Sequence, residues 1–377
     1  MAAGLLDADW MDVALRLAQQ GHGYVEPNPM VGCVLVADGE AIGEGAHLQF
    51  GDHHAERAAI ANAHQRGNAG RLAGATAYVT LEPCCHYGKT PPCSDALLES
   101  RISRVVIAML DPFEKVRGQG AEILRQAGVA VDVGIQENSA RRLNAPYLKR
   151  LTTGRPWVIA KWAMSLDGKI ATRTGHSQWI SSRASRQKVQ VLRGMVDAIV
   201  VGAGTALADN PQLVARTPEP PPRRALRVVT DSCLRIDLSS HLVAGARAYP
   251  TLLWAGPDAD PVRATELRNA GCLVEISQAT EPGKRLDELL VYLAQQHSAT
   301  NVLVEGGGQL LGSLLDLKQI DQCEVFVAPK LIGGIAAAAP IAGLGFGSVD
   351  DGPQCMDITF DTLDTDLHIS CRLKYAL

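Results

Sequence analysis

Two short stretches carry residues that could hold a metal ion and move a proton. His54-Ala55-Glu56 offers an imidazole and then a carboxylate, and Cys84 and Cys93 offer two thiols. Zinc takes nitrogen and sulfur ligands tetrahedrally, and a catalytic zinc leaves its fourth position to water. One histidine and two cysteines are three such ligands. The sequence therefore predicts a catalytic zinc site in which Glu56 is free to shuttle a proton.

A structural zinc is the main alternative. Structural sites usually close the tetrahedron with four protein ligands, and Cys85 or His86 could supply the fourth. That arrangement would leave Glu56 without a role. A set of unrelated core residues is a weaker alternative, because the order His-x-Glu followed by Pro-Cys is the pattern of zinc deaminases.

Helices and strands alternate around these residues in an order typical of an α/β domain. His54 and Cys93 each fall in the first turn of a predicted helix, and helix N-termini favour thiolates and other anions. The predicted helices are 7–20, 54–66, 93–101 and 118–127, and the predicted strands are 31–37, 40–45, 75–81, 104–109 and 129–133.

A polar, basic segment, predicted as a short helix and connector, ends at Gly154-Arg155-Pro156. We therefore assign residues 1–150 to one domain and residues 151–377 to a second α/β domain. The second domain is expected to contain strands 157–163, 198–201, 226–230, 251–254, 272–276, 301–304 and 324–328, helices 182–193, 260–270, 286–297 and 309–317, and a closing hairpin of 356–363 and 367–373.

Two glycine-rich turns follow apolar strands in the second domain. They are Glu305-Gly306-Gly307-Gly308, before a predicted helix, and Gly202-Ala203-Gly204-Thr205. Bare amides at a helix start bind phosphate, so the pair favours a phosphate-bearing cofactor. Either turn alone would be interpreted as a tight strand-to-helix connection without a ligand, since neither has the Rossmann pattern. Candidate contacts for an anionic substrate are Lys161, Ser177, Arg193 and Arg216, although an isolated arginine is usually a solvated surface charge.

Composition argues against several classes of function. The chain has 377 residues, nine cysteines and a formal net charge of −4. No basic surface is therefore expected for nucleic acid or an anionic membrane. We expect neither a secretory signal nor a membrane-spanning segment, because no apolar run of the required length and no basic start is apparent. Scattered cysteines in odd number predict free or metal-bound thiols in a cytoplasmic protein. We expect a small-molecule substrate and a homo-oligomer.

Over nearly its whole length the chain resembles the bifunctional riboflavin biosynthesis family, which joins a pyrimidine deaminase to a uracil reductase. The eight residues between Cys84 and Cys93 are similar to this family and differ from the two usual in cytidine and tRNA adenosine deaminases. That spacing argues against tRNA editing. The motifs of the first domain are Pro27-Asn28-Pro29-x-Val31-Gly32, His54-Ala55-Glu56, Thr80-Leu81-Glu82-Pro83-Cys84 and Gly88-Lys89-Thr90-Pro91-Pro92-Cys93. Those of the second are Lys161-x-x-x-Ser165-Leu166-Asp167-Gly168, Ser177-x-Trp179-Ile180, Leu207-Ala208-Asp209-x-Pro211 and Val304-Glu305-Gly306-Gly307.

The resemblance implies a fold and a pair of reactions. The fold would be a cytidine-deaminase-like three-layer α/β/α domain followed by a dihydrofolate-reductase-like α/β domain. The first reaction would be the zinc-dependent hydrolytic deamination of 2,5-diamino-6-(5-phosphoribosylamino)pyrimidin-4(3H)-one. The second would be the NADPH-dependent reduction of the ribosyl side chain to ribityl.

The resemblance also implies roles for single residues. His54, Cys84 and Cys93 would hold Zn²⁺, and Glu56 would act as the catalytic proton shuttle. Substrate contacts would be Asn28 and Lys89 in the deaminase, and Ser177, Arg193, Leu213, Arg216 and Glu305 in the reductase. The residues lining NADPH would be Ala163, Trp179, Thr205, Asp209, Ser232, Gly307, Gly308, Gln309, Leu310, Leu311, Gly312 and Ser313.

Two positions depart from the family pattern. Cys85 stands where the family often has serine, which places a spare thiol beside the metal ligands. Asp111-Pro112-Phe113-Glu114 replaces the usual Asp-Pro-Asn-Pro. Two further hypotheses stay open: a deaminase whose second domain only binds ligand or drives assembly, and a zinc-stabilised scaffold without activity.

Overall fold

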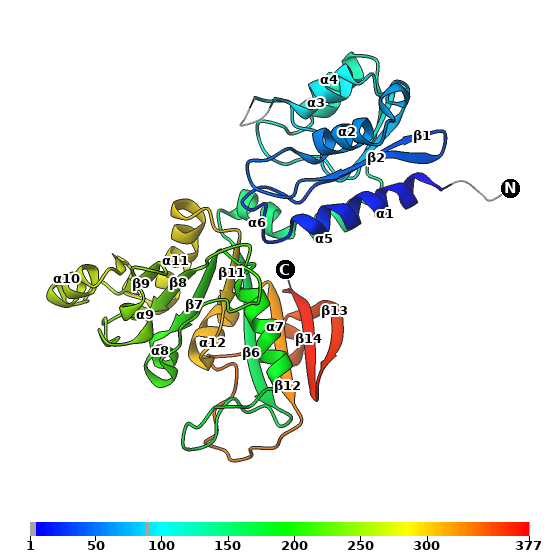
Figure 1. Cartoon of the computed structure of the whole chain (residues 1–377). Helices are drawn as coiled ribbons and strands as arrows, with labels where there is room; N and C mark the ends of the chain where they lie inside the picture. The colour runs from blue at the N-terminus through cyan, green and yellow to red at the C-terminus, as the bar shows by residue number, and fades with distance from the viewer. Residues whose placement is uncertain (1–4, 88–90, 377) are drawn as a thin grey trace. The chain divides into compact units, whose positions relative to one another are not determined.

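The chain divides into two compact units, Met1–Thr153 and Gly154–Leu377, in a computed structural model that describes residues 5–87 and 91–376 (Figure 1). The division falls close to residue 150, where the polar connector placed the domain boundary. Both units are α/β structures in which helices cover the two faces of one sheet.

The sheet of the first unit has the order β2-β1-β3-β4-β5. Strand β1 is antiparallel to β2 and β3, whereas β3, β4 and β5 are parallel. The turn between β1 and β2 has positive φ at both Asp38 and Gly39, as a two-residue hairpin turn requires. The strands are β1 (Gly32–Ala37), β2 (Glu40–Ala46), β3 (Thr76–Val79), β4 (Arg104–Ile107) and β5 (Ala130–Val133), which confirms the five predicted strands.

Helices form a layer on each face of this sheet (Figure 1). One layer is α2 (Ala55–Gln65), α3 (Cys93–Glu99) and α4 (Gln119–Gln126), whose apolar residues share a core with one side of the strands. The other layer contains α1 (Asp7–Ala18) and α5 (Glu137–Leu143). The result is the expected three-layer α/β/α arrangement. The segment expected to be a short helix and connector forms two helices, α5 and α6 (Ala145–Thr153).

Glycines let α2 lie directly on β2. A Cβ atom added to Gly45 would come within 2.4 Å of the carbonyl oxygen of Ala55 and 2.3 Å of the amide nitrogen of Ala59. One added to Gly43 would come within 2.5 Å of the carbonyl oxygen of Ala59. Such distances are far below van der Waals contact. The glycines of β2 therefore set the short distance between this strand and α2, which carries His54 and Glu56 at its N-terminal end.

The second unit contains a nine-stranded sheet in the order β10-β9-β8-β7-β11-β6-β12-β14-β13. The strands from β10 to β12 are parallel, and β14 and β13 form an antiparallel hairpin at the edge. The parallel strands are β6 (Trp157–Ser165), β7 (Ala198–Gly202), β8 (Leu226–Thr230), β9 (Thr251–Ala255), β10 (Leu273–Ile276), β11 (Asn301–Val304) and β12 (Gln322–Ala328), and the hairpin is β13 (Gln354–Leu363) and β14 (Asp366–Lys374).

Two cores hold the helices of this unit against the sheet. One contains apolar residues of α11 (Pro282–Gln296) and α12 (Gly308–Asp316). The other contains residues of α8 (Ala203–Asp209), α9 (His241–Ala244) and α10 (Pro261–Asn269), with α7 (Arg183–Arg193) packed beside them. The sequence did not predict α8 or α9, since each is at most two turns long. The expected loop at Ala203 is thus the first turn of a helix.

Candidate active sites

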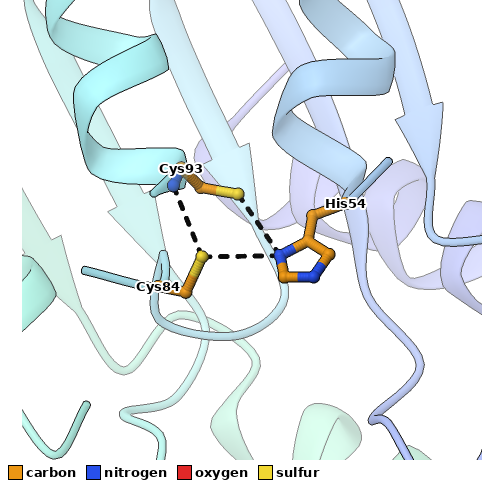
Figure 2. A group of neighbouring side chains, drawn as sticks. All are labelled: His54, Cys84 and Cys93. Carbon is orange, nitrogen blue, oxygen red and sulfur yellow. Dashed lines mark hydrogen bonds between the residues drawn. The ribbon is translucent and has the colours of Figure 1, made fainter. Parts of the chain in front are cut away.

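Three predicted metal ligands meet at one point in the first unit (Figure 2). His54 precedes α2 as its N-cap, Cys93 opens α3, and Cys84 lies in the loop after β3. The Nδ1 atom of His54 lies 3.4 Å from Sγ of Cys84 and 3.5 Å from Sγ of Cys93. Zinc bonds of about 2.0–2.3 Å at tetrahedral angles would separate nitrogen and sulfur by about 3.5 Å. The three donors therefore fit zinc in both type and spacing.

Neither neighbour of Cys84 supplies a fourth ligand. The thiol of Cys85 donates to the carbonyl oxygen of Lys115 at 3.6 Å, and the His86 ring packs against Phe113. Within residues 5–87 and 91–376 the ligand cluster contains only His54, Cys84 and Cys93. The closed, four-ligand site considered as an alternative therefore lacks its fourth protein ligand in the described part of the chain.

The two cysteines differ in their electrostatics. The amide of Cys93 donates to Sγ of Cys84 at 3.3 Å. A hydrogen bond from the Cys93 thiol, with help from His54, lowers the pKa of the Cys84 thiol to about 4. The same bond, together with burial, raises the pKa of Cys93 well above its usual value. Without metal the pair therefore holds one thiolate, and metal binding has to displace the second proton.

Glu56 is buried beside the ligands, with only 3% of its surface exposed. Burial is the main cause that raises the pKa of its carboxyl to about 7, and the Cys84 thiolate adds to the effect. A group with a pKa near neutrality can both accept and release a proton under ordinary conditions. The environment of Glu56 thus suits the role that the sequence assigned to it.

A pocket of about 360 Å³ opens beside the cluster, lined by Asn28, His54, Glu56 and Cys84 among others. His47 lines it too, although sequence reasoning missed this residue. The His53 carbonyl, 3.1 Å from Nδ1 of His47, can only accept, so Nδ1 carries the proton. Nε2 of His47 then accepts from the Asn28 amide at 3.2 Å. His47 therefore orients the predicted substrate contact Asn28.

Asp111 and Tyr147 form another part of the pocket wall that the sequence did not reveal. The Tyr147 hydroxyl donates to Oδ1 of Asp111 at 3.0 Å, and burial raises the pKa of the Asp111 carboxyl. Tyr147 comes from α6, which lies in the segment predicted as a short helix and connector. The only signal in the sequence was an Asp-Pro pair soon after a strand. Lys89, the other predicted contact, lies outside the described residues.

Two adjoining pockets, of about 790 and 520 Å³, lie at the carboxyl ends of the parallel strands in the second unit. This edge is where open α/β sheets bind ligands. The predicted residues that line the larger pocket are Lys161, Ala163, Ser177, Trp179, Thr205, Asp209, Arg193, Leu213, Arg216, Glu305, Gly307, Gly308 and Leu311. Those that line the smaller pocket are Ser177, Thr205, Asp209, Ser232, Gly307, Gly308, Gln309, Leu310 and Ser313.

The two glycine turns fit a phosphate-bearing cofactor. A Cβ atom added to Gly307 would lie 3.2 Å from Oγ1 of Thr205, so glycine keeps the space between the turns open. Gly308 begins α12, whose free amides favour an anion. Gly312 has a different role: it lines neither pocket, and an added Cβ would lie 2.2 Å from the carbonyl oxygen of Ala342. It serves close packing.

Arg193 and Glu305 form a bidentate ion pair in the larger pocket. Nε and Nη2 of Arg193 lie 2.5 and 2.8 Å from the two carboxylate oxygens, and both side chains are nearly buried. Burial alone would raise the pKa of the Glu305 carboxyl, but Arg193 and Lys161 outweigh it and lower that pKa. Because Glu305 already binds Nε and Nη2 of Arg193, this guanidinium is not free to bind a phosphate in the same bidentate way.

Other cations line the same pocket and were missed from the sequence. Arg183 and Arg186 lie on α7 with Arg193, and the guanidinium of Arg186 stacks over the ring of Trp179 at 4.6 Å. Residues three apart share a helix face, so the spacing of 183 and 186 was an available signal. Together with the exposed Arg216, they make this pocket attractive to an anionic substrate.

Two family models match the chain. Residues 6–109 match the cytidine and deoxycytidylate deaminase zinc-binding region, and residues 156–369 match the RibD C-terminal domain. The riboflavin biosynthesis protein RibD of Actinobacillus pleuropneumoniae is 42% identical over 92% of this chain and 90% of that protein. The Escherichia coli protein of the same name is 38% identical over 92% of this chain and 94% of its own length.

Solved structures agree with these matches. Acinetobacter baumannii RibD has a TM-score of 0.81 and 34% identity, covering 98% of this chain and 99% of that one. A Thermotoga maritima protein gives the same values for all four measures. It is described as a diaminohydroxyphosphoribosylaminopyrimidine deaminase/5-amino-6-(5-phosphoribosylamino)uracil reductase.

Proposed function

The chain belongs to the RibD family of riboflavin biosynthesis proteins, and we propose that its two units divide the family's two reactions between them. It is a bifunctional enzyme that deaminates and then reduces a small molecule, with zinc and NADPH as cofactors. We assign deamination of 2,5-diamino-6-(5-phosphoribosylamino)pyrimidin-4(3H)-one to Met1–Thr153, and reduction of the ribosyl side chain to ribityl to Gly154–Leu377.

The observation that carries the deaminase assignment is the buried carboxyl of Glu56 beside three convergent zinc ligands. Bound zinc would lower the pKa of a water molecule to near neutrality. Glu56 takes a proton as the water attacks the amino-bearing carbon, and it returns a proton to the departing ammonia. Asn28, held by His47, contacts the pyrimidine in the pocket.

The reductase assignment rests on the two adjoining pockets of the second unit. NADPH would supply hydride at the line where the pockets meet. The chain's residues provide recognition: Gly307 and Thr205 leave room for the cofactor. Arg183, Arg186 and Arg216 attract the substrate's phosphate. Glu305 fixes Arg193, and the pair forms one wall beside the ribose chain.

The substitution Glu56→Gln tests the deaminase assignment. Loss of the proton shuttle should lower the rate of ammonia release about 10²- to 10⁴-fold, while bound zinc, measured by metal analysis, stays at the wild-type level. NADPH consumption with the deaminated intermediate should persist. Glu122→Gln, on the exposed side of α4, is the matched control and should deaminate normally. Equal ammonia release by the two variants would contradict the role of Glu56. No ammonia release from the zinc-loaded wild type or from either variant would leave a zinc-stabilised scaffold as the better hypothesis.

We also propose that the chain works as a homo-oligomer, without nucleic acid, in the cytoplasm. Strand β13 supports self-association, because it is a long edge strand that exposes Met356, Ile358 and Phe360. None of the helices in residues 5–87 and 91–376 is long and apolar enough to cross a membrane. All nine cysteines are free, as in a reducing compartment.

Sedimentation velocity tests the self-association. Phe360→Lys should shift the protein toward a smaller species, because a lysine on an edge strand opposes strand pairing. Val262→Lys places the same charge on exposed α10 and should leave the sedimentation coefficient unchanged. A wild-type protein that sediments as a monomer at micromolar concentration would contradict the proposal.

A further inference from the structure

The smaller pocket of the second unit continues past the glycine turns to the ends of β8 and β9. It meets the larger pocket at Thr205, Asp209 and Gly307. Given the proposed reductase function, on which this inference rests, the hydride-donating ring must lie at that meeting line to reach the substrate. The adenosine end of the cofactor then lies at the opposite end of the smaller pocket. That end is lined by Ser232, Arg235, Trp254 and Arg285.

The charge at this end is positive. Two of its lining residues are arginines, and the acidic residue that lines the smaller pocket, Asp209, lies at the meeting line. Sites for NAD place a carboxylate on the 2′-hydroxyl of the adenosine ribose, whereas an arginine accommodates a 2′-phosphate. The lining of the pocket thus suits a phosphorylated ribose.

The two arginines differ in what already holds them. Nη1 of Arg285 donates to the carbonyl oxygens of Ala279 and Thr280, so its guanidinium ties down the turn before α11. Nε of Arg235 lies 3.3 Å from Oδ1 of Asp231, a carboxylate with no solvent exposure. In the described part of the chain no other hydrogen bond or ion pair engages Arg235, whose side chain is 60% exposed. Its two terminal nitrogens are available to a ligand.

The loop that carries Arg235 is well anchored. The amide of Ile236 donates to the other oxygen of Asp231 at 2.9 Å, and Ser232 accepts the Gly256 amide through its carbonyl oxygen. We infer that Arg235, assisted by the Ser232 hydroxyl, binds the 2′-phosphate of the cofactor and sets the preference for NADPH over NADH. A planar guanidinium that is held only at Nε can still donate hydrogen bonds from its two terminal nitrogens to two phosphate oxygens.

Calorimetric titration of the full-length protein tests this with two probes, adenosine 2′,5′-bisphosphate and adenosine 5′-monophosphate. The wild type should prefer the bisphosphate. Arg235→Gln should weaken bisphosphate binding about 10- to 100-fold, the range expected for losing charged hydrogen bonds, and leave monophosphate binding nearly unchanged. Arg235→Lys should restore part of the preference. The ratio of kcat/KM for NADPH to that for NADH should fall in parallel.

Arg285→Gln provides the comparison within the same pocket, and it should retain the preference for the bisphosphate. Loss of the preference in Arg285→Gln with retention in Arg235→Gln would overturn the assignment. If Arg235→Gln weakened the binding of both probes equally, the assignment would also be overturned. That result would show that the substitution disturbs the loop and that Arg235 makes no contact with the 2′-phosphate. A wild type that binds neither probe would instead contradict the reductase function of the unit.

Discussion

Single residues in this chain are tuned by their burial and by their charged neighbours. Glu56 and Glu305 are both buried carboxyls, yet their pKa values move in opposite directions. Glu56 lies beside a thiolate and its pKa rises to about 7, whereas Glu305 lies between Arg193 and Lys161 and its pKa falls. The first can therefore exchange a proton near neutral pH, and the second stays ionised and holds Arg193 in place.

The ion pair of Arg193 and Glu305 should dominate the stability of its surroundings. Glu305→Gln leaves a buried guanidinium without a counter-charge, which costs about 3–5 kcal/mol. We expect a loss of that size in the free energy of unfolding of the second unit, measured in urea. Glu266→Gln removes an exposed pair with Arg263 and should cost less than about 1 kcal/mol. Similar losses in the two variants would contradict this account.

The same pair predicts a pH dependence. The pKa of Glu305 is lower in the folded state than its usual value of 4.5, so the folded state binds fewer protons near that pH. The stabilisation is complete above the unfolded pKa and is lost as the pH falls through the folded one. Between about pH 5 and pH 3 the wild type should therefore lose stability more steeply than Glu305→Gln. If the unfolding free energies of the wild type and Glu305→Gln fell in parallel with pH, the stabilising role of the Glu305 carboxylate would be contradicted.

At the scale of elements, close contact between a helix and a strand positions the deaminase site. Gly45→Ala should force α2 away from β2 and move His54 and Glu56 from the cysteines. Overpacking of this kind costs about 1–3 kcal/mol, and zinc affinity should fall with it. Gly70→Ala is the matched control, because a Cβ atom there meets nothing within 4 Å. Unfolding curves measure the loss of stability, and competition with a zinc chelator measures the loss of zinc affinity.

The sequence predicted the regular elements well, and it predicted many but not all of the residues that line the pockets. Strands β8 and β11 match their expected ranges, since continuous apolar runs mark buried parallel strands. The zinc ligands were predicted because their types and order are specific. His47 and Tyr147 were missed, because each reaches its pocket only through tertiary packing and carries no local pattern. The engagement of Arg193 by Glu305 was equally invisible, since 112 positions separate the two residues.

For the whole molecule, we predict that the two activities respond separately to metal removal. Each unit contains its own sheet, cores and pockets. Dialysis against a zinc chelator should abolish ammonia release and lower the stability of the first unit, because metal binding contributes to folding. NADPH consumption with deaminated substrate should continue. Adding back zinc should restore ammonia release, and simultaneous loss of both activities would contradict separate sites.

A coupled assay on metal-analysed protein tests the central claim most directly. Ammonia release and NADPH consumption are followed together from the diaminopyrimidine substrate. We predict one zinc per chain, ammonia release first, and NADPH consumption that follows it in equal amount. Ammonia release without NADPH consumption would contradict the reductase assignment and leave the second unit as a binding or assembly module. Neither product from zinc-loaded protein would contradict the enzymatic account altogether.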